Sequence, residues 1–179
     1  MTANITEQLR IILKGGQVKR YHTRPVIHGQ DNAQHQYMVA SLVCLLNPKA
    51  SAQTIKNALW HDIYEYETGD MPWAIKRQNP HIKQAIMEIE NKSIARYGLS
   101  TKQTELEHSV LKLAEYFECT LFCIEQRRMG NQEFDQSIID CIDQINLIHL
   151  FVSKKDRKIY ERSKQLLDTL IREVQSCQN

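Results

Sequence analysis

Apolar residues recur at intervals of three and four along most of this chain, which is the spacing of one face of an α-helix. In the segment DNAQHQYMVASLVCLL, residues 31–46, such a face contains Val39, Leu42, Val43 and Leu46. No window shows the sustained alternation of apolar and polar residues that indicates a strand. The pattern therefore predicts an all-α fold.

Glycine, proline and polar capping residues suggest where these helices begin and end. Gly15 and Gly16 follow the first apolar run, and a loop with Pro72 leads to Lys76. The expected helices cover residues 5–14, 31–46, 51–69, 80–97, 101–129, 131–152 and 154–176. Because there is no repeat and no long linker, we expect these helices, about seven in all, to form a single domain over residues 1–179.

The composition is ordinary for a globular protein, with 42% hydrophobic and 25% charged residues. A formal net charge of +2 gives no reason to expect a nucleic-acid or membrane partner. No basic leader precedes an apolar run, and no stretch approaches the ~20 apolar residues of a membrane span, so we expect a cytoplasmic protein of a bacterium or an infected host. Cys119 and Cys123 lack a second ligand pair, and we interpret them as buried free thiols in a reducing compartment.

Three of the predicted helices direct imidazole or carboxylate groups toward what could be a common interior. His35 lies four residues before Val39 and shares its inward face. Asp62, next to His61, continues the apolar stripe of the following helix, and Glu115 lies on an inward stripe farther along. A lone histidine at such a position is usually a core residue, but a set of nitrogen and oxygen donors suits zinc, manganese, cobalt or iron. A metal ion would also offset the cost of burying the carboxylates.

Glu65 and several cations near the proposed ligands suggest that the metal site acts on a phosphate group. Glu65 lies one helical turn after Asp62, where it can orient or deprotonate a metal-bound water; the alternative is a solvated helix end. Cations flank the proposed ligands at Arg20, Lys76, Arg77 and Lys112. Each alone is typical of a surface charge, but together they favour binding of phosphate oxygens. Since no glycine-rich phosphate loop is present, these side chains and a metal would have to hold the phosphate.

Four blocks of the sequence resemble the HD-domain metal-dependent phosphohydrolases. The blocks are RYHT at 20–23, QDNAQHQ at 30–36, ALWHDIYEYETGDMPWAIKR at 58–77 and LKLAEYFECTLFCIEQRRMGN at 111–131. Within that superfamily they are most similar to the bacterial 5′-deoxynucleotidases and their phage relatives, some of which are dATP triphosphohydrolases. The order and spacing of the blocks are much more specific than the His-Asp pair alone.

The resemblance implies an HD-domain helical bundle that hydrolyses deoxynucleotides with a divalent metal. The metal would be Zn, Co or Mn, with an additional Mg as an option beside the phosphates, and a homo-oligomer is also implied. The implied metal ligands are His35, His61, Asp62 and Glu115, and the implied catalytic residues are Glu65 and Asp62. The implied substrate contacts are Arg20, Lys76 and Lys112 for phosphate, Tyr21 for the sugar and Asp70 for the 3′-hydroxyl.

Two departures from the family pattern leave alternatives open. Glu115 stands where the family has an aspartate, which indicates adjusted ligation, weaker metal binding or lost activity. Gln34 stands where the family has an acid. Two substrate classes remain open. Deoxynucleoside triphosphates, dATP or another, are favoured, and deoxynucleoside monophosphates are the alternative. A non-catalytic nucleotide-binding module and a purely structural helical protein are the less favoured interpretations.

Overall fold

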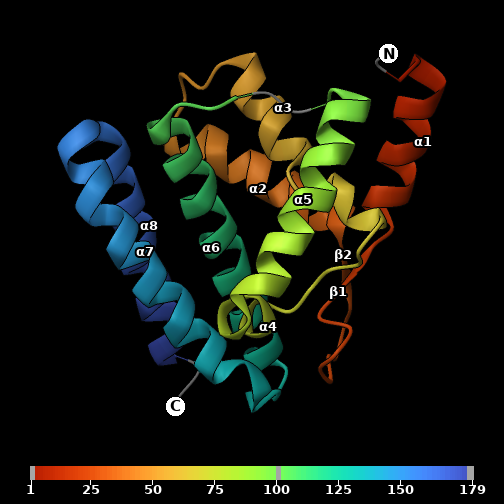
Figure 1. The fold of residues 1–179 in the computed structure, drawn as a ribbon. Coiled ribbons are helices and arrows are strands. Elements are labelled where there is room, and N and C mark those ends of the chain that lie inside the picture. Colours follow the sequence, from red (N-terminus) through yellow and green to blue (C-terminus); the bar gives the residue numbers. More distant parts are fainter. Residues whose placement is uncertain (1–2, 100–101, 177–179) are drawn as a thin grey trace.

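Eight α-helices and two 3-10 helices account for most of residues 3–99 and 102–176, the part of the chain that this computed structural model describes (Figure 1). The helices are α1 (Ile5–Gly16), α2 (Asn32–Leu46), α3 (Ala52–Trp60), η1 (Ile63–Tyr66), α4 (Trp73–Gln78), α5 (Pro80–Tyr97), α6 (Glu105–Arg128), η2 (Gln132–Phe134), α7 (Asp135–Lys155) and α8 (Arg157–Ser176). Two strands of two residues each, β1 (Lys19–Arg20) and β2 (Gln30–Asp31), complete the list. The all-α prediction is confirmed.

The main core lies where α2, α6, α7 and α8 pack together, with α6 at the centre of these contacts. Its fully buried members include Val39, Val43, Leu113, Phe117 and Ile145. A second apolar cluster joins α1 to η1 and the end of α5. His61 and Asp62 lie between Ala58, which belongs to the main core, and Ile63, which belongs to the second cluster. The two cores together therefore position this part of the candidate site.

Gln34, which departs from the family pattern, has a structural role at the start of α2. The side chain of Asp31 accepts a hydrogen bond from the Gln34 backbone N–H at 3.0 Å, and Gln34 Oε1 accepts one from the Asp31 N–H at 3.2 Å. This reciprocal pair is a capping box, which satisfies backbone donors that have no partner inside the helix. Gln34 thus caps the helix that carries His35.

The predicted helix over residues 51–69 is wrong in its second half, because α3 ends at Trp60. His61 is the C-cap, and Asp62 leads into the separate 3-10 helix η1. Gln36 of α2, with its amide turned so that both partners are satisfied, donates to the Leu59 carbonyl and accepts from the Ile63 N–H. A side chain from another helix therefore takes up the backbone groups that helix continuation would have paired.

Two further elements lie where the sequence pattern predicted irregular chain. Lys76 belongs to the short helix α4 and not to a loop. Strands β1 and β2 pair antiparallel, with Arg20 opposite Gln30, and they close the irregular segment between α1 and α2 into a hairpin-like loop. Such two-residue pairings are too short to produce an alternating pattern in the sequence.

The ends of the last three long helices also shift from their expected positions. Helix α6 begins at Glu105, while Thr101, the expected first residue, lies outside the described residues. Helix α7 continues past Ser153, and the break comes at Asp156, whose side chain accepts from the backbone N–H groups of Lys158 and Ile159. An aspartate that caps the next helix is therefore a stronger boundary than the serine.

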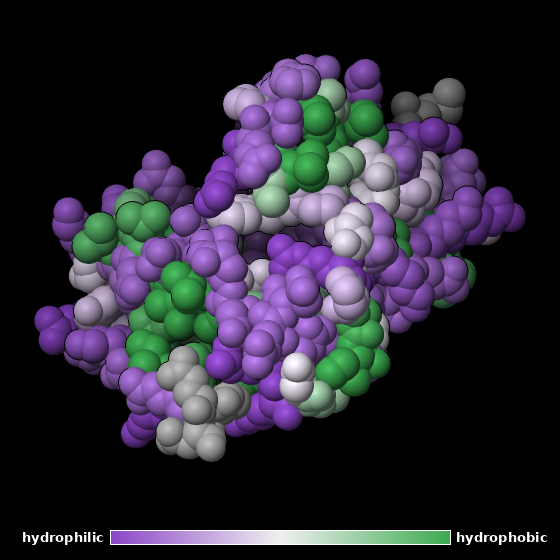
Figure 2. All heavy atoms as spheres, turned by 90° about the horizontal axis from the view of Figure 1, so that it is seen from below, coloured by the Kyte–Doolittle hydropathy of each residue, from purple (hydrophilic) through white to green (hydrophobic). Residues whose placement is uncertain are grey.

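The face seen from below in Figure 2 is mainly hydrophilic and is hollowed near its middle. Apolar side chains on this face gather in separate patches. Within residues 3–99 and 102–176, no helix is both long enough and apolar enough to cross a membrane.

Gly15 allows α1 to approach η1 closely. We therefore expect alanine substitutions at Gly15 and at the neighbouring Gly16 to differ in their effect on stability. A Cβ at Gly15 would lie 2.5 Å from Ile63 Cγ1 and still closer to the Ile63 carbonyl oxygen, whereas a Cβ at Gly16 would meet only Ala33 Cβ at 3.3 Å. We expect Gly15→Ala to lower the free energy of unfolding by about 1–3 kcal/mol through overpacking. Gly16→Ala should change it by less than about 1 kcal/mol, because the helix propensity of alanine compensates. Urea unfolding of both variants measures this, and equal stabilities would contradict it.

Candidate active site

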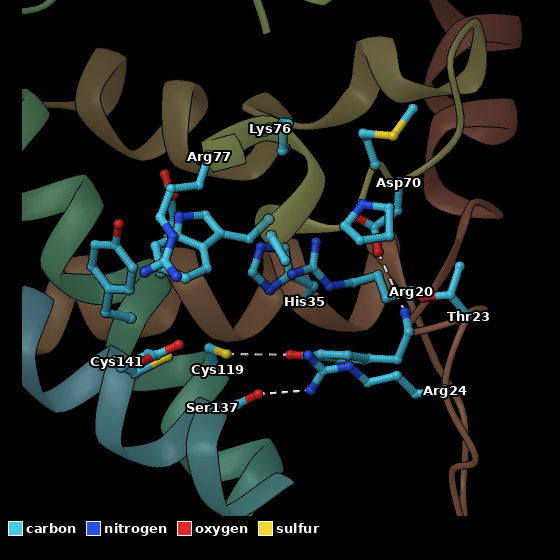
Figure 3. A pocket seen from close by; sticks show the side chains of 18 of the residues that line it. Arg20, Thr23, Arg24, His35, Asp70, Lys76, Arg77, Cys119, Ser137 and Cys141 are labelled. Carbon is cyan, nitrogen blue, oxygen red and sulfur yellow. Dashed lines mark hydrogen bonds between the residues drawn. The ribbon is translucent and has the colours of Figure 1, made fainter. Parts of the chain in front are cut away.

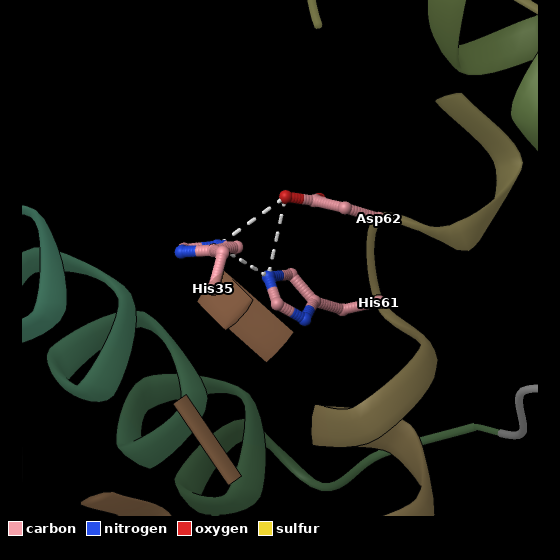
Figure 4. Close-up of side chains that lie close together, drawn as sticks. All are labelled: His35, His61 and Asp62. Atoms are coloured by element: carbon pink, nitrogen blue, oxygen red, sulfur yellow. Dashed lines mark hydrogen bonds and ion pairs between the residues drawn. The ribbon is translucent and has the colours of Figure 1, made fainter. Parts of the chain in front are cut away.

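His35, His61 and Asp62 bring three potential metal-ligating atoms together (Figure 4). Asp62 Oδ2 lies 3.4 Å from His35 Nε2 and 3.4 Å from His61 Nε2, and the two imidazole nitrogens are 3.1 Å apart. All three atoms lie within 4.8 Å of one another. The structure therefore gathers three of the four residues that were predicted as ligands.

The end of α3 determines how His61 and Asp62 face the cluster. The His61 Nδ1–H donates to the Ala58 carbonyl at 2.8 Å, so the lone pair of Nε2 points toward Asp62 and His35. Burial lowers the pKa of His61, which favours the neutral imidazole that a metal requires. Because the helix stops at Trp60 and His61 is its C-cap, Asp62 can turn its carboxylate to the same point.

His35 enters the cluster from α2 and is only 2% exposed. Its Nδ1–H donates to Glu118 Oε2 at 2.6 Å, which leaves Nε2 facing Asp62. Burial and Arg20 lower the pKa of His35, but the raising effects of Glu118 and Asp62 are larger, so the pKa of His35 is about 9. A metal ion that bound here at neutral pH would therefore displace a proton from His35.

Glu115, the predicted fourth ligand, lies beside the three-residue cluster and not within it. Its Oε1 is 4.0 Å from His61 Nε2, while its Oε2 accepts a hydrogen bond from Lys112 Nζ at 2.6 Å. Glu115 Oε1 is buried and has no hydrogen-bond partner among the described residues. Burial raises the pKa of Glu115, but Lys112 and His61 lower it below its ordinary value, so this carboxylate is ionised at neutral pH.

The donor set fits a divalent metal ion. Two imidazole nitrogens and one carboxylate oxygen suit zinc, cobalt or manganese, and the buried Oε1 of Glu115 lies 4.0 Å from one of these nitrogens, His61 Nε2. Burial raises the pKa of Asp62, but His61, His35 and Arg20 lower it well below its ordinary value, so the oxygen that such an ion needs is ionised. His35, His61 and Asp62 would hold the ion, and Glu115 as fourth ligand remains a prediction.

Glu65 is buried next to the cluster and is not part of a solvated helix end. Its side chain is 5% exposed, and its Oε2 accepts a hydrogen bond from Asn32 Nδ2 at 3.0 Å. The same Asn32 amide donates to the Asp62 backbone carbonyl at 3.2 Å, which ties Glu65 to the ligand segment. Burial and the charge of Asp62 raise the pKa of Glu65 to about 8. Without a metal this carboxyl group is therefore mostly protonated at neutral pH, and a cation bound beside it would favour the ionised form that can accept a proton.

A cavity of about 480 Å³ opens beside these groups, a size typical of ligand pockets. Figure 3 shows Arg20 entering it from β1, while Lys76 and Arg77 approach from α4. The cavity is also lined by Lys112 and by Arg24, whose Nη1 donates to Ser137 Oγ at 2.7 Å. Arg20 Nη1 donates to Asp62 Oδ2 at 3.2 Å, so this guanidinium reaches the metal cluster itself. All four cations that the sequence suggested for phosphate binding therefore line one cavity.

Tyr21 and Asp70, predicted to contact the sugar, lie together on the cavity wall. The Tyr21 backbone N–H donates to Asp70 Oδ2 at 3.3 Å, and Tyr21 has a φ of 55°, which is unusual for a residue other than glycine. The Tyr21 ring stacks on Phe122 with centroids 4.4 Å apart, and its hydroxyl donates to Cys119 Sγ at 3.4 Å. This left-handed backbone directs the ring into the pocket, and such local strain is common at binding sites.

Several residues of the site were missed or left without a role by sequence reasoning. Asn32, which holds Glu65, lies three residues before His35 and so shares its helix face; that spacing was an available signal. Trp73 lies at the cavity with Arg77 stacked 4.5 Å from its ring centroid, and it had no recognisable pattern. Polar residues of α7 also line the cavity: Gln136, Ser137, Asp140 and Gln144. Cys119, expected to be buried, is only partly so and forms part of the cavity wall.

The chain matches the family model "HD domain" over residues 13–171. It is 34% identical over 95 residues to the 5′-deoxynucleotidase yfbR of Photorhabdus temperata, covering 44% of this chain and 47% of that protein. It is 37% identical over 75 residues to the 5′-deoxynucleotidase PM0747 of Pasteurella multocida, covering 42% of this chain and 36% of that protein. The matched regions thus span about half or less of these curated relatives.

Similarity to a solved structure extends over nearly the whole chain. The HD phosphohydrolase DatZ of cyanophage S-2L, solved with dA and one catalytic Zn²⁺ ion bound, superposes with a TM-score of 0.70 at 18% identity. The superposition covers 96% of this chain and 99% of DatZ, which shows a shared fold. Because the family model covers most of its length and includes the His-Asp pair, the chain belongs to the HD domain family.

Proposed function

We propose that this protein is a metal-dependent phosphohydrolase of deoxynucleotides, with a deoxynucleoside triphosphate such as dATP as substrate. The observation that carries the proposal is the convergence of a His-His-Asp cluster, a buried glutamate and five cationic side chains on one cavity. The names of the bacterial relatives and of the phage structure, all hydrolases associated with deoxynucleotides, support the same reaction class.

In the proposed reaction, water attacks the α-phosphorus, the bond to the 5′-oxygen breaks and that oxygen takes up a proton, so that the deoxynucleoside and triphosphate are released. Glu65 accepts a proton from the attacking water, and the Asn32 amide keeps its carboxylate in place. Arg20, Lys76 and Lys112 stabilise the charge that develops on the phosphate oxygens. A divalent ion held by the cluster would supply Lewis-acid polarisation and lower the pKa of the water.

The number of cations favours a triphosphate over a monophosphate. Arg20, Arg24, Lys76, Arg77 and Lys112 all line the cavity. A deoxynucleoside monophosphate has about two negative charges at neutral pH, whereas a triphosphate has more charge to be balanced by such side chains. Hydrolysis of monophosphates to deoxynucleoside and inorganic phosphate is the second candidate, which the named 5′-deoxynucleotidase relatives favour.

An assay of products tests the proposal. Purified protein, loaded with Co²⁺, Mn²⁺ or Zn²⁺ and supplied with Mg²⁺, is incubated with the four deoxynucleoside triphosphates, the monophosphates and ATP, and the products are separated by chromatography. We expect deoxynucleoside and triphosphate from at least one deoxynucleoside triphosphate and little reaction with ATP. Inorganic phosphate from monophosphates alone would establish the second candidate. Binding of metal and nucleotide without turnover would instead establish a non-catalytic nucleotide-binding module.

Location and assembly complete the proposal. We propose a homo-oligomer, as the family resemblance implies, and a cytoplasmic location. Light scattering coupled to size-exclusion chromatography measures the assembly, and a monomer at working concentrations would contradict that part of the proposal.

A further inference from the structure

Glu118 is a buried carboxylate that the proposed reaction does not use directly. It lies on α6, is 2% exposed and has no place among the three clustered ligands. Its Oε2 accepts from His35 Nδ1 at 2.6 Å and its Oε1 accepts from Gln30 Nε2 at 2.6 Å. Both hydrogen bonds are short, as expected where a charged acceptor is buried. A buried carboxylate is costly unless its partners are well defined, so the arrangement needs a reason.

The contact with His35 decides which ring nitrogen faces the cluster. An ionised carboxylate can only accept hydrogen bonds, so Nδ1 of His35 must carry the proton. The lone pair that can bind a metal is then on Nε2, which lies 3.4 Å from Asp62 Oδ2. In the other neutral tautomer, Nδ1 would face Glu118 without a proton and Nε2–H would face the metal. Glu118 therefore selects the tautomer that can act as a ligand.

Gln30 holds the far side of Glu118. Gln30 belongs to β2, where it pairs with Arg20 of β1. The two-stranded sheet therefore places the residue that holds Glu118 opposite Arg20, which lines the cavity. Gln30 Oε1 is buried and has no hydrogen-bond partner among the described residues. The Gln30 amide group can therefore rotate by 180° without losing a hydrogen bond of its oxygen.

We propose that Glu118 is a positioning residue for the metal site: its carboxylate, held by Gln30, fixes the tautomer and orientation of His35 and thereby strengthens metal binding. The ring of a metal-ligating histidine commonly donates its second N–H to a carboxylate, which orients the ring and increases its basicity as a ligand. The inference rests on the metal site of the proposed function, and it adds a residue that acts through His35 rather than on the substrate.

Two variants separate orientation from charge. Glu118→Met keeps much of the volume but removes both carboxylate oxygens and leaves only a weakly accepting sulfur, so Nδ1 of His35 loses its strong acceptor. Glu118→Gln retains one oxygen, which can accept from His35, while its amide group can donate to Gln30 Oε1 once the Gln30 amide turns over. The glutamine variant therefore keeps the tautomer of His35 and loses only the charge.

Ser163→Ala is a matched control. Ser163 is buried and shares a 2.6 Å hydrogen bond with Nε2 of another histidine, His149, between α7 and α8. Neither residue lines the cavity. In this variant a buried histidine that is distant from the candidate site loses its hydrogen-bond partner. The variant therefore measures how such a loss affects stability without a change at the metal site.

The test is a titration of the metal-free proteins with Co²⁺, followed by its visible absorption and by competition with a chelator, with thermal unfolding as a check of folding. We expect Glu118→Met to bind Co²⁺ about 10- to 100-fold more weakly and with an altered spectrum. Glu118→Gln should lose less affinity and keep a spectrum like that of the wild type. Ser163→Ala should bind Co²⁺ as the wild type does, whatever its stability.

The outcomes distinguish this inference from the proposed function. Wild-type affinity and spectrum in a folded Glu118→Met variant would overturn the role of Glu118 and leave the proposed function intact. Equal losses in the glutamine and methionine variants would overturn the tautomer argument, because charge alone would then explain the effect. If the wild-type protein itself bound no Co²⁺, the metal site and the proposed function would fail together.

Discussion

Replacing Asp62 with alanine is expected to abolish metal binding and to lower turnover on the order of 10³-fold or more. Asp62 Oδ2 is the one carboxylate oxygen in the three-atom cluster, and it faces both His35 Nε2 and His61 Nε2 at 3.4 Å. Without it, only the two imidazole nitrogens of the three-atom cluster would remain. Loss of metal catalysis removes several kcal/mol of transition-state stabilisation, and each 1.4 kcal/mol is a factor of ten in rate.

The measurements are product formation under saturating metal and Co²⁺ affinity of the metal-free variant. Asp143→Ala is a suitable control, because Asp143 is an exposed aspartate of α7 that does not line the cavity. Arg20 also loses its hydrogen bond to Asp62 in the variant, so circular dichroism and thermal unfolding should accompany the assays. Turnover near the wild-type rate in Asp62→Ala would refute a catalytic role for the cluster.

The second large effect is expected for Glu65→Gln, which should lower kcat about 10²- to 10⁴-fold and leave metal affinity nearly unchanged. A glutamine oxygen can still accept the hydrogen bond from Asn32, so the local structure should persist. It cannot accept a proton from water at neutral pH. Glu65 is not a member of the ligand cluster, which is why metal binding and turnover should separate in this variant.

Glu67→Gln provides a control from the same short segment. Glu67 follows Glu65 by two residues, is exposed, and accepts a hydrogen bond from the Tyr66 hydroxyl. We expect its substitution to leave kcat and KM unchanged. If Glu65→Gln kept the wild-type kcat, Glu65 could not be the proton acceptor. If it lost Co²⁺ binding as well, its role would be in holding the metal.

Helical spacing was a reliable guide wherever the burial of one face was the only requirement. His35 was placed on an inward face because it lies one turn before Val39, and both residues are indeed buried. Motif spacing was equally informative for the cations, since Arg20, Lys76 and Lys112 reach one cavity from separate elements. Glu115 was placed on an inward stripe, but spacing could not show that Lys112 would take one of its oxygens.

The amino-acid sequence by itself determined the helical class, the family and the identities of the groups that meet at the candidate site, because periodicity and motif order are visible along the chain without knowledge of its packing. Only the tertiary structure decided the break after Trp60, since Gln36 of another helix takes up the freed backbone groups. It likewise decided the contact of Glu118 with His35, 83 residues apart in the chain. Both depend on packing between distant segments, which has no signature in local spacing.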